Sequence, residues 1–184
     1  MDCYLRRPPY AWLNGIMRHI FPILLLALCF SSSVLFAGPP VLTGEAEILS
    51  GDTLSVAGRT VHLKGIEAPV DGQRCRVASG RAYDCGLVSR TALMDLTVAT
   101  RVTCRLTGVM RGGLPEAHCI AGRYDLSEGM VHTGWALALP KSGTKYSRVQ
   151  KGAKKAGNGM WRGEFVAPWD WQNGVRLAKE RKTP

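Results

Sequence analysis

Two short runs with alternating apolar residues, joined by a glycine turn, constrain the fold of this chain most strongly. The runs cover residues 53–56 and 59–66, with Ala57-Gly58 between them, a pattern typical of a β-hairpin. In the second run Val61 and Leu63 alternate with polar side chains, so one face of that strand is expected to be buried.

Two carboxylates stand at the ends of these predicted strands. Asp52 precedes the first strand directly after a glycine, and Glu67 follows the second strand. Strand ends on a rigid scaffold can hold two acids against one cation or one ligand. The pair is therefore a candidate metal site. The alternative is that Asp52 caps a turn while Glu67 is a solvated strand end.

The rest of the chain predicts further strands and then helices. Strands are expected at 44–49, 101–106 and 117–121, helices at 85–96, 125–133 and 146–156, a loop at 69–81 and a turn region at 108–115. Asp125 and Glu128 have the spacing of a capping box at the second helix. Strands followed by interposed helices predict an α+β domain over residues 38–176, with a flexible basic tail at 177–184.

The first 37 residues have the features of a secretory signal. Arg18 precedes an apolar run at 20–30, and small residues end the segment. Cleavage would export the protein to the periplasm or the extracellular space, with no stable membrane span after processing. The alternative is a membrane anchor formed by residues 20–36, at the lower limit of a spanning length. Met17 could serve as an alternative start.

Export fits the four cysteines outside this leader. They are Cys75, Cys85, Cys104 and Cys119. Disulfides are expected in an exported protein, but four cysteines allow three pairings and the sequence alone does not choose among them. Local geometry suggests pairs 75–85 and 104–119, each stabilising the fold by about 3 kcal/mol. A zinc site is the competing interpretation, although the chain contains no Cys-x-x-Cys pair.

The charge balance favours a polyanionic partner, either a nucleic acid or an acidic polysaccharide. The whole chain has 24 Lys and Arg against 14 Asp and Glu; without the leader, which holds three and one of these, 21 remain against 13. Arg148, Lys151 and Lys155 have the i, i+3, i+7 spacing of one helix face, which makes them a candidate polyanion-binding site. The alternative is an ordinary solvated helix surface.

Several motifs together resemble the thermonuclease-like (staphylococcal-nuclease-like) family, in its secreted bacterial branch. They are Gly51-Asp52-Thr53, Gly65-Ile66-Glu67-Ala68-Pro69, Gln73-Arg74-Cys75, Tyr83-Asp84-Cys85-Gly86, Gly134-Trp135-Ala136 and Gly159-Met160-Trp161. The likeness covers residues 43–174. It implies a five-stranded OB-type β-barrel with about three helices.

The resemblance also implies what the site would need for phosphodiester hydrolysis. In the family two acids hold a divalent cation, calcium in the best-known nuclease, and these positions match Asp52 and Glu67. The water-activating glutamate is replaced by Val70, and the two phosphate-binding arginines are replaced by His62 and Leu114. Losing these groups together is expected to remove nearly all activity, which predicts a catalytically degenerate nuclease-fold protein.

The same resemblance implies two further candidate functions. An active calcium-dependent endonuclease acting on DNA or RNA would need Asp71 as base, a protonated His62 as a weak cation, and Arg111 folded back across Gly112-Gly113. The chain is also similar to a thermonuclease-like component of succinoglycan biosynthesis. That similarity implies a role in exopolysaccharide production.

Overall fold

The computed structural model describes residues 38–141 and 143–178. The expected signal segment with Met17, and most of the expected basic tail, lie outside the described residues. No helix within the described ranges is long and apolar enough to cross a membrane.

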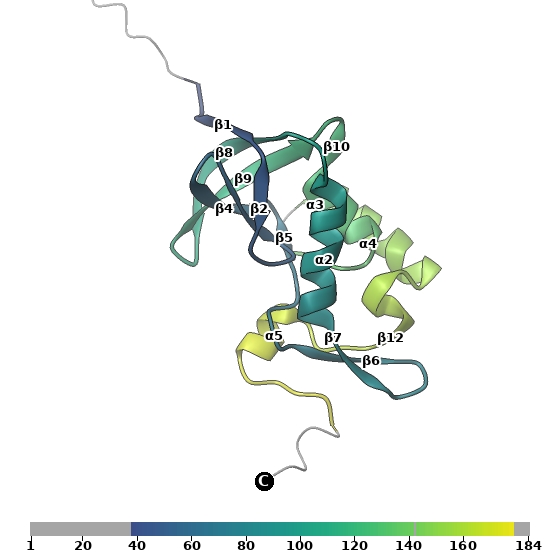
Figure 1. Cartoon of the computed structure of the whole chain (residues 1–184). Helices are drawn as coiled ribbons and strands as arrows, with labels where there is room; N and C mark the ends of the chain where they lie inside the picture. Colours follow the sequence, from purple (N-terminus) through teal and green to yellow (C-terminus); the bar gives the residue numbers. More distant parts are fainter. Residues whose placement is uncertain (1–37, 142, 179–184) are drawn as a thin grey trace, which may run out of the picture. The chain divides into compact units, whose positions relative to one another are not determined.

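Seven strands form the main sheet of the unit that begins at residue 38 (Figure 1). They are β1 (Val41–Gly44), β2 (Ala46–Ile48), β3 (Thr53–Val56), β4 (Arg59–Leu63), β8 (Val102–Arg111), β9 (Leu114–Ala121) and β10 (Tyr124–Asp125). The order is β1-β8-β9-β4-β3-β2, with β10 paired to β9. All neighbours are antiparallel except β4 and β9. The first and last strands of this order are separated in sequence by Glu45 alone.

The predicted β3–β4 hairpin is confirmed. Ala57 and Gly58 form its two-residue turn with positive φ angles of 51° and 74°, the backbone that matches the twist of paired strands. Val61 and Leu63 are fully buried, together with Leu54 and Val56 of the facing strand. The alternating pattern therefore identified the buried face of the hairpin correctly.

The predicted turn region at residues 108–115 is wrong. Strand β8 continues to Arg111, β9 begins at Leu114, and only Gly112-Gly113 form the turn, both with positive φ. A register shift between Leu106 and Met110 interrupts the ladder, which is why the alternating pattern fades there although the hairpin continues.

Five helical segments accompany the sheets in the described part of the chain. They are α2 (Cys85–Thr97), α3 (Leu126–His132), α4 (Thr144–Ala156), the 3-10 helix η1 (Gly159–Arg162) and α5 (Pro168–Gln172). Asp125 caps α3 as predicted, since its side chain accepts a hydrogen bond from the Glu128 amide at 3.2 Å. Helix α3 packs against α4 (Figure 1). The mixed α+β class is thus confirmed, while the main sheet has more strands than expected and no hydrogen-bonded pairing of β1 with β2 closes it.

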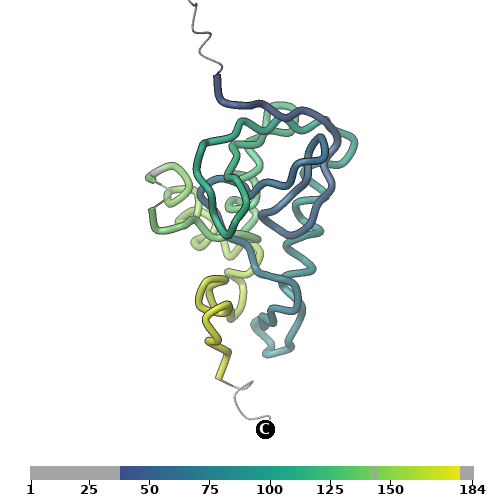
Figure 2. Tube along the Cα trace, turned by 90° about the vertical axis from the view of Figure 1, so that its left-hand side faces the viewer, coloured from purple at the N-terminus to yellow at the C-terminus, as the bar shows by residue number. Residues whose placement is uncertain are grey.

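Two smaller sheets lie outside the main one. Strand β5 (Ile66–Glu67) pairs with β11 (Leu137–Ala138), and β6 (Arg74–Val77) lies between β7 (Ala82–Asp84) and β12 (Gly163–Glu164). The predicted loop at 69–81 is therefore wrong, since it contains a strand. Its partner β7 is local, but β12 comes from a distant part of the chain. Figures 1 and 2 show the blue segment near residue 75 and the yellow segment near residue 165 at the same end of this unit.

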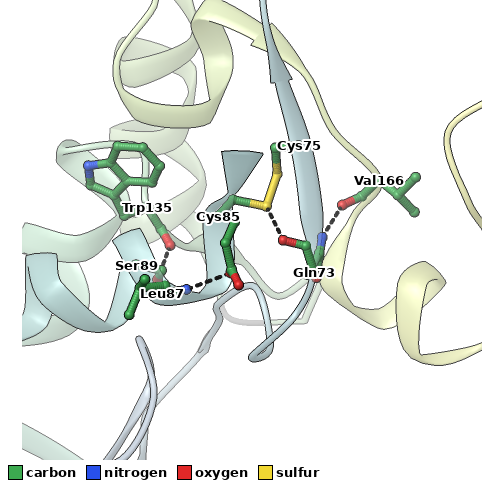
Figure 3. The surroundings of a disulfide bond; sticks show 8 residues. Gln73, Cys75, Cys85, Leu87, Ser89, Trp135 and Val166 are labelled. Carbon is green, nitrogen blue, oxygen red and sulfur yellow. Dashed lines mark hydrogen bonds between the residues drawn. A yellow bond between two sulfur atoms is a disulfide. The ribbon is translucent and has the colours of Figure 1, made fainter. Parts of the chain in front are cut away.

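Two disulfides stabilise this arrangement, and both join the pairs that local geometry suggested. Cys75–Cys85 links β6 to the first residue of α2, and Cys104–Cys119 links β8 to β9. All four cysteines are buried. Beside the first disulfide, the buried Gln73 amide donates to the carbonyl of Val166 at 2.8 Å (Figure 3). The C-terminal segment is thereby tied to the middle of the chain.

Candidate functional site

Asp52 is a buried carboxylate whose oxygens are engaged by protein donors. Its Oδ1 accepts hydrogen bonds from the hydroxyls of Ser50 (2.8 Å) and Thr53 (2.9 Å), and its Oδ2 accepts from the Ala68 amide (3.0 Å). The turn that carries it is tight, because a Cβ at Gly51 would collide with Ser89 and Ala68. Asp52 therefore joins β3 to the chain that follows β5.

His62 continues this network on the neighbouring strand. Its Nδ1 lies 2.8 Å from the hydroxyl of Thr53. Since that hydroxyl donates its one hydrogen to Asp52, His62 Nδ1 acts as the donor to Thr53. Burial lowers the pKa of His62, and the positive charge of Arg111 lowers it further. A neutral imidazole at pH 7 carries no positive charge, so His62 does not act as an arginine would.

Arg111 lies between two carboxylates at the tip of the β8–β9 hairpin. Its Nη1 is 3.8 Å from Glu67 Oε2, its Nε is 3.2 Å from Glu116 Oε1, and its Nη2 donates to the Leu63 carbonyl at 3.3 Å. All three charged side chains are less than one quarter exposed. The structure therefore brings Arg111 to the candidate site, across the Gly112-Gly113 turn. We call Asp52, Thr53, His62, Glu67, Arg111 and Glu116 the polar cluster.

Glu67 is the second acid that the sequence proposed as a metal ligand. Its Oε1 accepts a hydrogen bond from the amide of Gln172 in α5, at 2.8 Å. Burial raises the pKa of Glu67, and the negative charge of Asp52 raises it further, whereas Arg111 and Gln172 act in the opposite direction. Glu67 is thus held by one cation and one amide of the protein itself.

The polar cluster does not fit a calcium ion well. Calcium takes six to eight oxygen ligands, and the two proposed acids already bind protein donors. Glu116 is paired with Arg111, whose guanidinium would repel a metal ion. Over residues 38–141 and 143–178, no group of three or more His, Cys, Asp or Glu side chains could hold a metal ion.

Asp71, the candidate base, pairs with a cation outside the polar cluster. It forms an ion pair with Arg90 of α2 at 3.6 Å, and its side chain is 63% exposed. No hydrogen bond or ion pair joins Asp71 to the polar cluster among the residues described. The structure therefore brings Arg111 and His62 together with the two acids, whereas the candidate base is engaged by Arg90.

The candidate polyanion-binding residues lie on one exposed helix. Arg148, Lys151 and Lys155 of α4 are all exposed, and in the described part of the chain none forms an ion pair. Lys154 lies over the ring of Trp161, 5.4 Å from its centroid. We call Arg148, Lys151 and Lys155 the α4 basic face.

Sequence reasoning missed Glu116 and Gln172. Glu116 lies opposite His62 in the parallel β4–β9 pairing, which no local pattern indicates. Gln172 comes from α5, a helix that was expected only as an ordered aromatic tail. One usable signal was present: Glu116 lies in a strand in which Ala117, Cys119 and Ala121 alternate as buried residues, so its side chain faces away from that core.

A comparison with known proteins finds a relative whose name states a biological role. The chain is 30% identical over 162 residues to the succinoglycan biosynthesis protein ExoI of Rhizobium meliloti (strain 1021), covering 86% of this chain and 84% of that relative. The chain belongs to the ExoI family. No family model matches it. The ExoI likeness extends over most of the described unit, so it includes both the polar cluster and the α4 basic face.

Proposed function

We propose that this ExoI-family protein is an exported thermonuclease-fold protein that binds an anionic polymer during exopolysaccharide production and does not hydrolyse phosphodiesters. The observation that carries the proposal is the position of Arg111, which provides a built-in cation between Glu67 and Glu116. A site whose acids already accept protein donors and pair with an arginine has few free oxygen ligands left for a catalytic cation.

The thermonuclease-like fold is supported by the ends of the main sheet. Strands β1 and β2 occupy opposite ends of the strand order, yet they are consecutive in sequence with one residue between them. A single bent strand over residues 41–48 would belong to both ends and complete an OB-type barrel. The motifs that resemble the family support the same assignment.

Loss of hydrolysis is supported by the groups at three positions. Val70 offers no base, Leu114 offers no cation, and His62 has a lowered pKa and donates to Thr53. Removing one preorganised charge donor typically costs about 10²- to 10³-fold in rate. Positions that must act together would lose most of the activity when all of them change.

The role in exopolysaccharide production rests on the relative ExoI, which is named as a succinoglycan biosynthesis protein. Export is supported by the signal-like leader and by two buried disulfides. Binding of an anionic polymer is supported by the α4 basic face, because its three exposed cations have no acidic partner within the described ranges. Either an acidic polysaccharide or a nucleic acid could satisfy it.

The proposal is tested by cleavage and binding assays on the disulfide-bonded chain. We expect no cleavage of DNA or RNA with calcium or with a chelator. We expect polygalacturonate binding that falls at least tenfold in the triple variant Arg148→Gln, Lys151→Gln, Lys155→Gln. The matched control replaces three exposed cations elsewhere, by Arg59→Gln, Lys64→Gln and Arg101→Gln, so that net charge changes equally. Equal losses in both variants would reduce the effect to overall charge and contradict the assigned face.

A second candidate function is phosphodiester hydrolysis, with Asp71 as the base and Arg111 as the phosphate ligand. One observation favours it, namely that Arg111 does lie beside Glu67. Cleavage that disappears in both Asp71→Ala and Arg111→Gln would establish this alternative. Cleavage that is absent from the unaltered protein in every divalent metal would remove it.

A further inference from the structure

We propose that the groove between α3, α4 and strands β9 and β10 binds a carboxylated saccharide. This inference deepens the proposed function, on which it rests, by assigning a second site that recognises individual sugar units. The groove has a volume of about 640 Å³, within the usual range for ligand sites. It lies apart from the polar cluster, since the two share no residue.

The floor of the groove is apolar and open. Leu96, Ile120 and Val149 line it, and Gly129 and Gly152 come from the two helices. A Cβ at Gly152 would meet no atom within 4 Å, so the space beside this residue is empty rather than filled by a neighbour. A glycine costs about 1 kcal/mol relative to alanine inside a helix, and here the missing side chain widens the groove.

The acids in the groove already accept protein donors. Asp125 Oδ2 accepts hydrogen bonds from Lys145 Nζ (2.8 Å), Tyr146 Oη (3.0 Å) and His118 Nε2 (3.2 Å). Burial by itself would raise the pKa of Asp125, but the Lys145 hydrogen bond and the other donors lower it overall. Lys145 also pairs with Glu128 at 3.0 Å. The carboxylates of the groove are therefore engaged by donors of the protein itself.

Among the described residues, two basic side chains of the groove are left without an acidic partner. Arg123 and His132 line it, and neither side chain has an ion-pair partner in the described part of the protein. A guanidinium is a planar fork that binds a carboxylate through two parallel hydrogen bonds. Arg123 therefore supplies the specific contact that a uronate-type carboxylate requires.

An aromatic side chain completes the site. Tyr124, next to Arg123, lines the groove and is 77% exposed, the most exposed of the large apolar residues described. A tyrosine ring offers an apolar face with a polar tip, and the C–H face of a pyranose ring can pack on such a surface. An isolated arginine beside an apolar floor fits a carboxylated sugar better than a polyphosphate chain, which favours a row of cations.

A row of cations, the α4 basic face, lies beside the groove on the same helix. Lys145, Val149 and Gly152 of the groove have i, i+4, i+7 spacing, whereas the α4 basic face has i, i+3, i+7 spacing. At 100° per residue, the centres of these two faces are separated by roughly 90° around the helix. One anionic polysaccharide could therefore place a sugar unit in the groove while its neighbours contact the basic face.

The test uses the full disulfide-bonded chain and trigalacturonic acid as the probe. Binding is followed by calorimetry and by backbone amide shifts in NMR spectra. We expect millimolar or tighter binding, with shifts at Tyr124, Gly129 and Gly152. Gly152→Phe, which fills the groove, and Arg123→Gln, which removes the fork, should each weaken binding at least tenfold. Arg59→Gln, at an exposed arginine outside the groove, is the matched control for Arg123→Gln and should bind as the unaltered protein does.

Several outcomes would overturn the inference. They are the absence of trigalacturonate binding, full binding by Arg123→Gln together with folded Gly152→Phe, equal binding of neutral cellotriose, and preferential occupation of the groove by a DNA hexanucleotide. If Gly152→Phe fails to fold, Arg123→Gln, a surface substitution, decides the result.

The α4 triple variant separates this inference from the proposed function. If polygalacturonate binding depends on the α4 basic face while trigalacturonate ignores Gly152→Phe, the groove is refuted and the polymer-binding function stands. If trigalacturonate depends on the groove while polygalacturonate ignores the α4 substitutions, the assigned basic face is refuted and the groove stands.

Discussion

The guanidinium of Arg111 lies 3.8 Å from the carboxylate of Glu67, although one belongs to the long β8 and the other to the two-residue β5. The same guanidinium is paired with Glu116 of β9. A protein cation thus links three strands at the place where the family resemblance implies a metal ion. We expect these ion pairs to stabilise the fold, and their contribution to the free energy of unfolding can be measured without any ligand.

Replacing Arg111 by Gln should lower the free energy of unfolding by about 2 kcal/mol, because two largely buried carboxylates lose their cation. Urea unfolding at pH 7 measures the change. The double variant with Glu67→Gln should recover part of the loss. Arg59→Gln, at an exposed position in β4, is the control and should change little. Equal losses of stability in Arg111→Gln and Arg59→Gln would argue against a stabilising role of the Arg111 ion pairs.

Stability should fall with acidification through His62. Its lowered pKa in the folded protein means that the unfolded chain takes up a proton first as the pH drops below about 6.5. The free energy of unfolding then declines by up to about 1.4 kcal/mol per pH unit until the folded-state pKa is passed. His62→Gln should flatten this dependence. Arg59→Gln, at an exposed site that does not titrate in this range, is the control and should leave the dependence unchanged.

Glu67 should show the opposite dependence at lower pH. Its pKa is raised in the folded state, so the folded protein binds a proton more readily than the unfolded chain as the pH approaches 4.5. Relative to the unaltered chain, Glu67→Gln should therefore raise the free energy of unfolding more at pH 7 than at pH 4. Paired urea titrations at the two pH values measure this difference, and a constant offset between the curves would contradict it.

The Cys104–Cys119 disulfide should contribute about 3 kcal/mol. It closes a loop of 15 residues between neighbouring strands, which restricts the unfolded chain. The double variant Cys104→Ala, Cys119→Ala should lose this amount in urea unfolding under oxidising conditions. In a reductant that breaks both disulfides the difference between the two proteins should become much smaller, and a persistent gap would point to lost packing instead.

Gly134 should be intolerant of any side chain. Its φ is +77°, and a Cβ there would collide with the backbone carbonyl of Asn158. Gly134→Ala should therefore destabilise the protein by at least about 2 kcal/mol. Gly152→Ala is the contrasting substitution in open space within α4, and it should stabilise the fold by about 0.5–1 kcal/mol. Thermal unfolding followed by circular dichroism compares the two.

Local patterns predicted the elements that depend on neighbouring residues. The β3–β4 hairpin needed only its alternation and the turn at Ala57-Gly58, and the cap of α3 needed only Asp125 and its spacing from Glu128. The pairing of β6 with β12 was missed because Arg76 pairs with Glu164, which is too far along the chain for a local pattern to indicate. Pairing across that distance is decided by packing rather than by propensity.

The candidate site divides in the same way. Asp52 and Glu67 could be named from strand ends, and Arg111 could be suspected from the glycines beside it. The contribution of Glu116 depends on the parallel pairing of β4 with β9, and that of Gln172 depends on α5 reaching Glu67. Both require the assembled fold, so the charge balance of the polar cluster could not be derived from the chain alone.

Strand β12 and the Gln73–Val166 hydrogen bond have a consequence for biosynthesis. The central strand of that small sheet is synthesised well before the segment that pairs with it. A nascent polypeptide must therefore carry an open sheet edge, with the Gln73 amide unpaired, until residues 163–166 have been made. Truncation before residue 163 should leave that edge available to other chains and promote aggregation.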